Sequence, residues 1–467
     1  MLQFPTQKKA VVKKEDGFST IGDGEVYLGD KFTHIVELDR AGVIQRKWVH
    51  GPNNSLAQVE LPHSSGKIWR SLGSWREPLF DAFLPVGFPH SVSPDYLAYQ
   101  TFDSLQAFFS TITSMLANRA LLEGLGVGDA SSSATYALLL TVLKDAMSRV
   151  ATIAFAHRFG LAIEPECKSY RFMADLFNDS AFFLDLVSPV LGGVPKVVVL
   201  STAEALRALC GVAAGASKAA LSSHFARQDN LAELNAKEAS QETAIGLIGL
   251  LVGTMVVKLV EDRATVFYLM VTLVFVHLLM NYLGVRYVTL RTLNRQRAAI
   301  LFYHWAETGQ VLTPSGVSSR ENIIFWLPVV KNEIGERVAS VSFARDYAGA
   351  LAGKLEMDIL RCPSYWLVVR HSPRADIRIL MMEDAEPGDV IEAWFSAMEV
   401  ARGLKTVEGA VDWDKRKRYP GGSTWAPLLA PDLRGKLERA GWDLSSATFE
   451  TGAPVRIRVG VAGKKNQ

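Results

Sequence analysis

Acidic residues gather in one short segment of the apolar middle of the chain. Asp175 and Asp179 are four residues apart, Asn178 directly precedes Asp179, and Asp185 follows nearly two turns later. On a helix, residues three and four apart lie on one face. Carboxylates of an embedded helix cannot face lipid without a large free-energy cost. This face therefore predicts a water-filled cavity, a cation or a basic partner, and with it a site for a small polar solute.

Basic residues upstream are candidates to meet these carboxylates, or to meet a phosphate or carboxylate of the solute. They are Arg119, Lys144 and Arg149. Asp145 and Arg149 are also spaced i,i+4 and could instead pair with each other. The acidic segment has an alternative interpretation too, as the water-facing side of an amphipathic helix. We favour the buried cluster because the same segment carries four phenylalanines.

Two further segments are candidate solute sites. The sequence GLGVGDASSS supplies Gly126, Gly128 and Asp129, and backbone N–H groups exposed before a helix can bind a phosphate. Its spacing matches neither a Rossmann motif nor a P-loop, so a turn between helices is the favoured interpretation. A polar run before the central apolar segment ends in Gln241 and Glu242, which could reach a cavity or anchor the chain among lipid headgroups.

The sequence contains no recognisable catalytic motif. The nine histidines are scattered, and the three cysteines lie far apart without a metal-ligand spacing. We therefore predict no catalytic residue, no metal site and no cofactor, and lean against an enzyme. His277 stands alone in an apolar run, and we expect it to be packed and hydrogen-bonded rather than a proton relay.

Long apolar stretches must position these residues. Two runs between 243 and 285 are separated only by KLVEDR and predict a transmembrane hairpin. The second has no charged residue over 22 positions, enough to cross about 30 Å of hydrocarbon. Weaker helical stretches cover 102–122, 134–159, 172–191 and 196–221. Small residues four apart favour close helix approach within the bundle or in a homo-oligomer, and they are Gly211 with Gly215 and Gly249 with Gly253.

The fold class expected is mainly α, a polytopic helical membrane bundle with a small C-terminal α/β or α+β domain. We expect a strand-containing extramembrane region at 1–80, a helical membrane domain at 81–298 with its hairpin at 243–285, and a soluble domain at 299–467. In that last domain, strands are predicted at 365–370 and 377–382, and a helix at 387–402. One face of that helix should be core, formed by Val390, Trp394, Phe395 and Met398.

The distribution of positive charge predicts on which side of the membrane the C-terminal domain lies. Four arginines between 286 and 297 follow the hairpin, and the positive-inside rule puts the C-terminal domain on the cytosolic or equivalent interior side. The tract 412–422 contains KRKR, and a solvated loop is favoured over contact with anionic lipid.

The net charge of +2 gives no reason to propose nucleic-acid binding. Secretion is disfavoured because the first twenty residues lack an apolar signal core.

Four segments in order resemble the root UV-B sensitive family: LPVGFPHSVSPDYLAYQTFDSLQAF, NRALLEGLGVGDASSS, FMADLFNDSAFFLDL and RQDNLAELNAKEASQETAIGLIGLL. The resemblance covers about residues 60 to 290. It implies a membrane-associated, mostly helical protein of a family tied in plants to vitamin B6 homeostasis, and it supplies no reaction. The motif positions carried over are Pro94, Asp95, Gln100, Asp103, Gly126, Gly128, Asp129, Asp175, Asn178, Asp179, Gln241 and Glu242.

These observations together predict an integral protein of the lipid bilayer, in an organelle that the sequence does not specify. It would bind or move a small polar solute, such as a B6 vitamer, in a cavity lined by Asp175, Asn178 and Asp179. The alternative is a non-catalytic membrane scaffold that presents its C-terminal domain to a protein partner.

Overall fold

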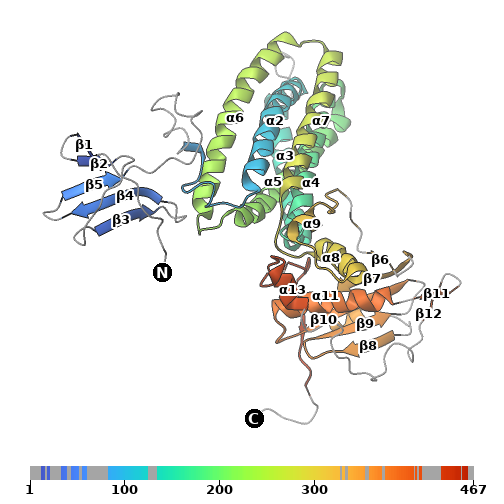
Figure 1. Ribbon diagram of the computed structural model, residues 1–467. Coiled ribbons are helices and arrows are strands. Elements are labelled where there is room, and N and C mark those ends of the chain that lie inside the picture. The colour runs from blue at the N-terminus through green and yellow to red at the C-terminus, as the bar shows by residue number, and fades with distance from the viewer. Residues whose placement is uncertain are drawn as a thin grey trace, which may run out of the picture. The chain divides into compact units, whose positions relative to one another are not determined.

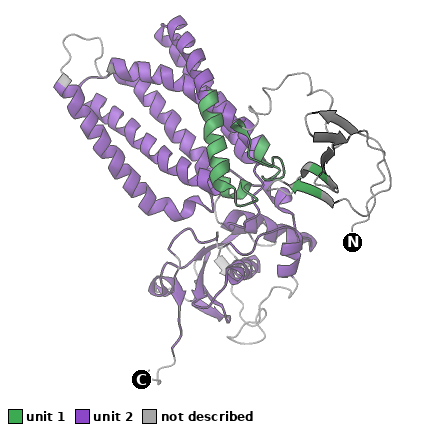
Figure 2. Cartoon of the chain, turned by 90° about the vertical axis from the view of Figure 1, so that its left-hand side faces the viewer, with its two compact units in different colours: residues 1–97, 222–245 green, residues 98–221, 246–467 purple. Residues whose placement is uncertain are grey.

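The computed structural model falls into two compact units. One comprises Met1–Leu97 and Ser222–Ile245, and the other Ala98–Leu221 and Gly246–Gln467 (Figure 2). This division differs from the domain boundaries expected at 80 and 298, which stay predictions. The structure describes residues 12–15, 18–21, 33–38, 44–51, 55–59, 82–124, 134–324, 326, 329–331, 335–352, 357–370, 374–403, 405–407, 410–412, 433–446, 448–453 and 455–460.

A five-stranded sheet occupies the N-terminal region, where the sequence analysis expected strands. Its order is β1-β2-β5-β4-β3, and only the pair β2 and β5 is parallel. The strands are β1 (Val12–Glu15), β2 (Phe18–Ile21), β3 (Thr33–Leu38), β4 (Ile44–Gly51) and β5 (Ser55–Val59).

Long helices dominate the middle of the chain and confirm that the fold is mainly helical (Figure 1). They are α2 (Tyr96–Gly124), α3 (Ala134–Ile163), α4 (Cys167–Val187), α5 (Gly193–Phe225), α6 (Leu231–Leu259) and α7 (Arg263–Tyr287), with a short 3-10 turn, η3 (Ser188–Val190), after α4. Asp262 begins α7 because its carboxylate accepts a hydrogen bond from the Thr265 backbone N–H at 2.9 Å.

Three of these helices, α5, α6 and α7, are long and apolar enough to span a membrane. The last two form the hairpin predicted from the sequence, and α5 corresponds to a weaker predicted helical stretch. In the most apolar 18-residue segment of each helix, the share buried within the protein is only 22% for α5, 11% for α6 and 28% for α7. Many of their large apolar side chains therefore point outward.

Glycines let α6 approach α2 closely. A Cβ added at Gly249 would lie 2.9 Å from the Thr111 Cβ, and one at Gly253 would lie 2.6 Å from the Met115 Sδ. The predicted close approach is therefore realised at this pair. Gly211 and Gly215 on α5 differ, because an added Cβ there would meet no described atom within 4 Å.

The C-terminal part contains a mixed sheet, as the sequence analysis expected. The order is β6-β7-β10-β9-β8, with β13 also on β10, and β10 runs parallel to β7 and to β13. The strands are β6 (Val329–Lys331), β7 (Arg337–Phe343), β8 (Met357–Arg361), β9 (Tyr365–Arg370), β10 (Ala375–Met382) and β13 (Arg456–Ile457), while β11 (Lys405–Val407) and β12 (Ala410–Asp412) pair separately. The helices are α8 (Arg295–Thr308), α9 (Pro314–Ser318), α10 (Tyr347–Leu351), α11 (Pro387–Arg402) and α13 (Leu433–Arg439).

Helix α11 forms the centre of this domain's core. A capping box of Glu386 and Asp389 begins it, and Pro387 occupies its first turn. The face predicted to be core is fully buried, with Trp394 and Phe395 packed among residues of the sheet. The predicted tract 412–422 lies outside the described residues, except for Asp412.

Candidate functional site

Polar side chains on three helices meet inside the helical part. On α2 they are spaced three and four apart, on α4 four and four, and on α7 four, so each set forms one stripe on its helix. We call this group the polar centre, and it consists of Tyr99, Asp103 and Gln106 of α2, Arg171, Asp175 and Asp179 of α4, and His277 and Asn281 of α7.

Arg171 holds two carboxylates of the polar centre. Its Nη2 lies 2.8 Å from the Asp103 Oδ1, and its Nη1 lies 3.1 Å from the Asp175 Oδ1. Only 12% of its side chain is exposed. The planar guanidinium suits this role, because its rigid fork can donate to two acceptors at once. Arg171 thus joins α2 to α4 by charge-assisted hydrogen bonds.

Helix α7 closes the centre from the other side. The His277 ring Nδ1 lies 2.8 Å from the Asp179 Oδ2, and both side chains are buried. Asn281 donates its amide to Asp175 and also to the Arg171 carbonyl oxygen at 3.2 Å. Asp175 accepts from Gln106 as well, so groups from three helices contact this one carboxylate.

Some buried atoms of the centre have no hydrogen-bond partner among the described residues. They include the Asp179 Oδ1 and the Asn281 Oδ1. A buried polar atom without a partner is costly and uncommon, so each one is a point where a ligand could bind. The centre contains three aspartates, of which Arg171 pairs with Asp103 and Asp175 while Asp179 contacts His277. Carboxylate oxygens predominate, so the centre is an environment for hydrogen-bond donors or positive charge.

Comparison with known proteins fits this arrangement. The family model of the vitamin B6 photo-protection and homoeostasis domain matches residues 69–309, a range that contains all six long helices and the whole polar centre. A relative from Arabidopsis thaliana, Protein root UVB sensitive 3, is 32% identical over 380 residues, which are 79% of this chain and 83% of the relative. The chain belongs to the root UVB sensitive family. The resemblance noted in the sequence is thereby confirmed.

Two other members of the root UVB sensitive family match over shorter ranges. RUS family member 1 of Dictyostelium discoideum is 36% identical over 267 residues, 56% of this chain and 51% of that protein. Protein root UVB sensitive 2, chloroplastic, of Arabidopsis thaliana is 28% identical over 333 residues, 69% of this chain and 72% of that protein. No solved structure matches the chain. The family is linked to vitamin B6 homoeostasis.

The structure brings together only part of the predicted site. Asp175 and Asp179 lie in the polar centre, while Asn178 is half-buried beside them on α4. Asp185, expected on the same acidic face, is fully buried and pairs with Arg207 of α5.

The three predicted bases lie elsewhere. Arg119 donates to the Val257 and Val260 carbonyl oxygens and so caps the end of α6. Lys144 lies 3.6 Å from the Glu204 carboxylate of α5, and Arg149 is exposed on α3. The cation that meets Asp175 is Arg171 instead.

The remaining candidates belong to the other compact unit or fall outside the described residues. Gln241 and Glu242 belong to the other compact unit, where the Gln241 side chain donates to the Phe83 carbonyl oxygen. Gly126, Gly128 and Asp129 fall outside the described residues.

Several members of the polar centre were not predicted from the sequence. Arg171 is four residues before Asp175, and that i,i+4 spacing was a usable signal. His277 and Asn281 are one turn apart in an otherwise apolar run, so together they mark a polar stripe that His277 alone did not. His277 is packed and hydrogen-bonded, as expected.

Proposed function

We propose that this chain is an integral membrane protein that binds and translocates a small polar solute at the polar centre, as its part in vitamin B6 homoeostasis. One observation carries the proposal: ionisable side chains are buried between α2, α4 and α7, while the outer faces of neighbouring helices are apolar. That is the reverse of a water-soluble helical domain.

The outer surface supports insertion in a bilayer. Leu251 of α6 is 74% exposed, and Leu259, Tyr268 and Phe275 are similarly open on α6 and α7. Contiguous apolar surface of this kind costs free energy in water and none in hydrocarbon. Carboxylates inside such a bundle persist only when they are paired, as Asp103 and Asp175 are by Arg171. In this proposal the C-terminal domain lies on the interior side.

The chemistry of the polar centre favours an uncharged or cationic solute. The Asp179 Oδ1 and the Asn281 Oδ1 are acceptors without a described partner, and they would receive hydrogen bonds from hydroxyl or protonated nitrogen groups. Pyridoxine carries both kinds of group. The three predicted bases are not at this centre, so an unphosphorylated vitamer fits it better than a phosphorylated one.

The test is uptake of labelled pyridoxine into neutral-lipid vesicles that contain the purified full chain. Asp179→Asn keeps the shape but removes the charge, and we expect uptake to fall about tenfold or more, as one lost charge-assisted hydrogen bond implies. Asp145→Asn is the matched control, because Asp145 is exposed on α3. Thermal unfolding checks that both variants are folded. Uptake by Asp179→Asn equal to that of the parent would overturn the proposal.

The scaffold alternative draws support from the C-terminal core. Its buried cluster is built around β7, β10 and α11, and it is large enough to present a stable surface. Removing residues after about 300 should then abolish function while leaving the helices in the membrane. That deletion also removes Glu321, the partner of buried Lys168 and buried Arg297, so the truncated chain should carry Lys168→Met and Arg297→Met. Pyridoxine uptake by this truncated chain would exclude the scaffold role as the sole function.

A further inference from the structure

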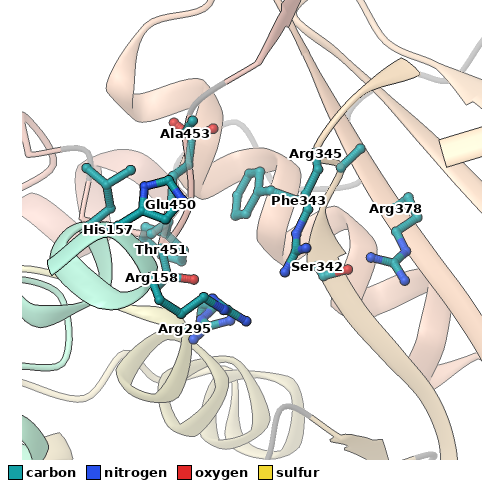
Figure 3. Close-up of a pocket in the computed structure, with 14 residues that line it drawn as sticks. His157, Arg158, Arg295, Ser342, Phe343, Arg345, Arg378, Glu450, Thr451 and Ala453 are labelled. Atoms are coloured by element: carbon teal, nitrogen blue, oxygen red, sulfur yellow. The ribbon is translucent and has the colours of Figure 1, made fainter. Parts of the chain in front are cut away.

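A cleft of about 730 Å³ lies where the end of α3 meets the C-terminal sheet. It shares no residue with the polar centre. Figure 3 shows Arg158 and Arg295 on one side, and Arg345 and Arg378 on the other. We infer that this cleft is a binding site for a phosphate-bearing small molecule, a site separate from the proposed solute path.

Uncompensated positive charge carries the inference. Within the described part of the chain, no carboxylate pairs with Arg158 or Arg345, although the Arg158 guanidinium lies over the Phe159 ring at 5.2 Å. Glu450 is the acidic residue of the lining, and Arg456 already binds it through both carboxylate oxygens at 2.8 and 2.9 Å. The cleft therefore keeps at least two positive charges without a counterion.

The other two arginines share their partners. Arg378 lies 2.9 Å from the Asp376 Oδ2, but Arg370 also binds that carboxylate, so one negative charge serves two cations. Arg295 lies 3.6 Å from the Glu166 carboxylate, a long contact, and its Nε is buried without a hydrogen-bond partner among the described groups. Both guanidinium groups thus retain donors for an added anion.

The guanidinium groups select phosphate chemistry. Each one offers a planar pair of donors that fits two oxygens, and a phosphate monoester carries about two negative charges on three strong acceptor oxygens. A phosphate can accept from arginines on both sides of the cleft, whereas a carboxylate has only two oxygens to share among them. Several converging arginines therefore match phosphate best.

The size and walls of the cleft indicate a whole molecule rather than a free ion. Its volume falls within the range of small-molecule sites, about 300–1,000 Å³. Phe343 lines it and stacks on Trp394, with ring centroids 5.9 Å apart, and buried Phe449 completes that wall. An organic group attached to the phosphate would lie against this rigid aromatic wall.

The test measures binding of phenyl phosphate to the purified full chain in neutral detergent. We expect Arg345→Gln to weaken binding about tenfold, the effect of one hydrogen bond to a charged group. Arg158→Gln should do the same. Both side chains are exposed, so neither change threatens folding. Arg149→Gln on α3 is the control outside the cleft and should bind as the parent does.

A parallel arm distinguishes a soluble ligand from a lipid headgroup. The same variants are titrated with phosphatidic acid and with phosphatidylcholine in mixed micelles. Binding of phosphatidic acid alone, weakened by Arg345→Gln, would assign the phosphate to a lipid headgroup and keep the site. Neither phosphate compound binding, or equal binding by Arg345→Gln and Arg149→Gln, would overturn the inference. This outcome is independent of pyridoxine uptake, because no residue is common to the two sites.

Discussion

Lys168, in the first turn of α4, lies 2.5 Å from the carboxylate of Glu321, which follows α9, and the two side chains are only 6% and 4% exposed. Arg297 of α8 lies 3.0 Å from the other oxygen of the same carboxylate. One buried carboxylate therefore pairs with two buried cations. The ion pair connects α4 with the segment that leads into the C-terminal sheet.

Removing the acid should cost more than removing either base. Glu321→Gln leaves two buried cations without a counterion, and we expect a loss of roughly 3–5 kcal/mol in the free energy of unfolding. Lys168→Met leaves Glu321 paired with Arg297 and should cost less. Thermal unfolding of the purified variants checks the order. A smaller loss for Glu321→Gln than for Lys168→Met would contradict the shared role of this carboxylate.

Acidification should weaken this connection. Burial alone would raise the pKa of Glu321, but the charges of Lys168 and Arg297 hold that pKa below its ordinary value of 4.5. The folded state then binds fewer protons than the unfolded chain. Its stabilisation is present above pH 4.5 and is lost as the pH falls through the lower folded pKa. We expect the parent's melting temperature to fall over this window and Glu321→Gln to show a shallower fall.

Glu166 provides the opposite sign for comparison. Its burial raises the pKa above 4.5, against the opposing effect of Arg295. A carboxyl group with a raised pKa loses stabilisation as the pH rises through its folded value. Glu166→Gln should therefore raise the melting temperature relative to the parent by more at neutral pH than at pH 4. Parallel melting curves for the parent, Glu166→Gln and Glu321→Gln across pH would show that neither group controls acid stability.

The glycines of α6 and α5 should respond oppositely to alanine. At Gly249 an added Cβ would lie 2.9 Å from the Thr111 Cβ and 3.3 Å from the Phe108 carbonyl oxygen, so Gly249→Ala should cost about 1–3 kcal/mol. At Gly211 no described atom lies within 4 Å, so Gly211→Ala should gain up to about 1 kcal/mol from helix propensity. The melting temperatures of the two variants and the parent test this prediction. A higher melting temperature for Gly249→Ala than for the parent would refute the close contact of α6 with α2.

Arg171 should be the most sensitive position of the polar centre. Arg171→Met leaves Asp103 and Asp175 buried without their cation, and we expect a loss of roughly 3–5 kcal/mol. Adding Asp103→Asn and Asp175→Asn should restore part of it, because the unpaired charges are then gone. Extraction in detergent followed by size-exclusion chromatography reports the folded fraction. No rescue in the triple variant would mean that Arg171 acts through packing alone.

A charged substitution on the outward face of α6 should weaken insertion of this helix in the bilayer. Leu251→Lys would place an ammonium near the middle of that span, at a cost of about 2.5–3.5 kcal/mol. Val459→Lys is the control, since Val459 is 56% exposed near the C-terminal end of the described chain. The fraction that resists alkaline carbonate extraction should fall for Leu251→Lys alone. Release of the parent chain by carbonate would reject the membrane assignment itself.

Helix bounds could be predicted from the sequence where local features, such as end residues and apolar periodicity, determine them. Helix α11 begins at Pro387 and ends at Arg402, the bounds that were expected, because a first-turn proline, acidic residues near the N-terminus and one apolar face all agree. The uninterrupted apolar run before Arg286 likewise predicted helix α7, since no charged residue divides it.

Two features of the sequence could not be interpreted from local spacing, because both depend on distant parts of the chain. Gly211 and Gly215 have the same spacing as Gly249 and Gly253, yet among the described residues an added Cβ meets another helix at the second pair and no atom within 4 Å at the first. Lys144 had a charge suited to Asp175, but the fold sets it beside Glu204. Residue spacing shows which face a side chain occupies and not which helix that face meets.

The sequence by itself determined the helical class, the apolar spans, the acidic stripe of α4 and the family. Only the tertiary structure decided that Asp179 meets His277, 98 positions away, and that Arg171 neutralises Asp103 and Asp175. The physical reason is the range of the forces. Helix formation and apolar periodicity depend on neighbours within a few residues, whereas ion pairing depends on how whole helices rotate and pack against one another.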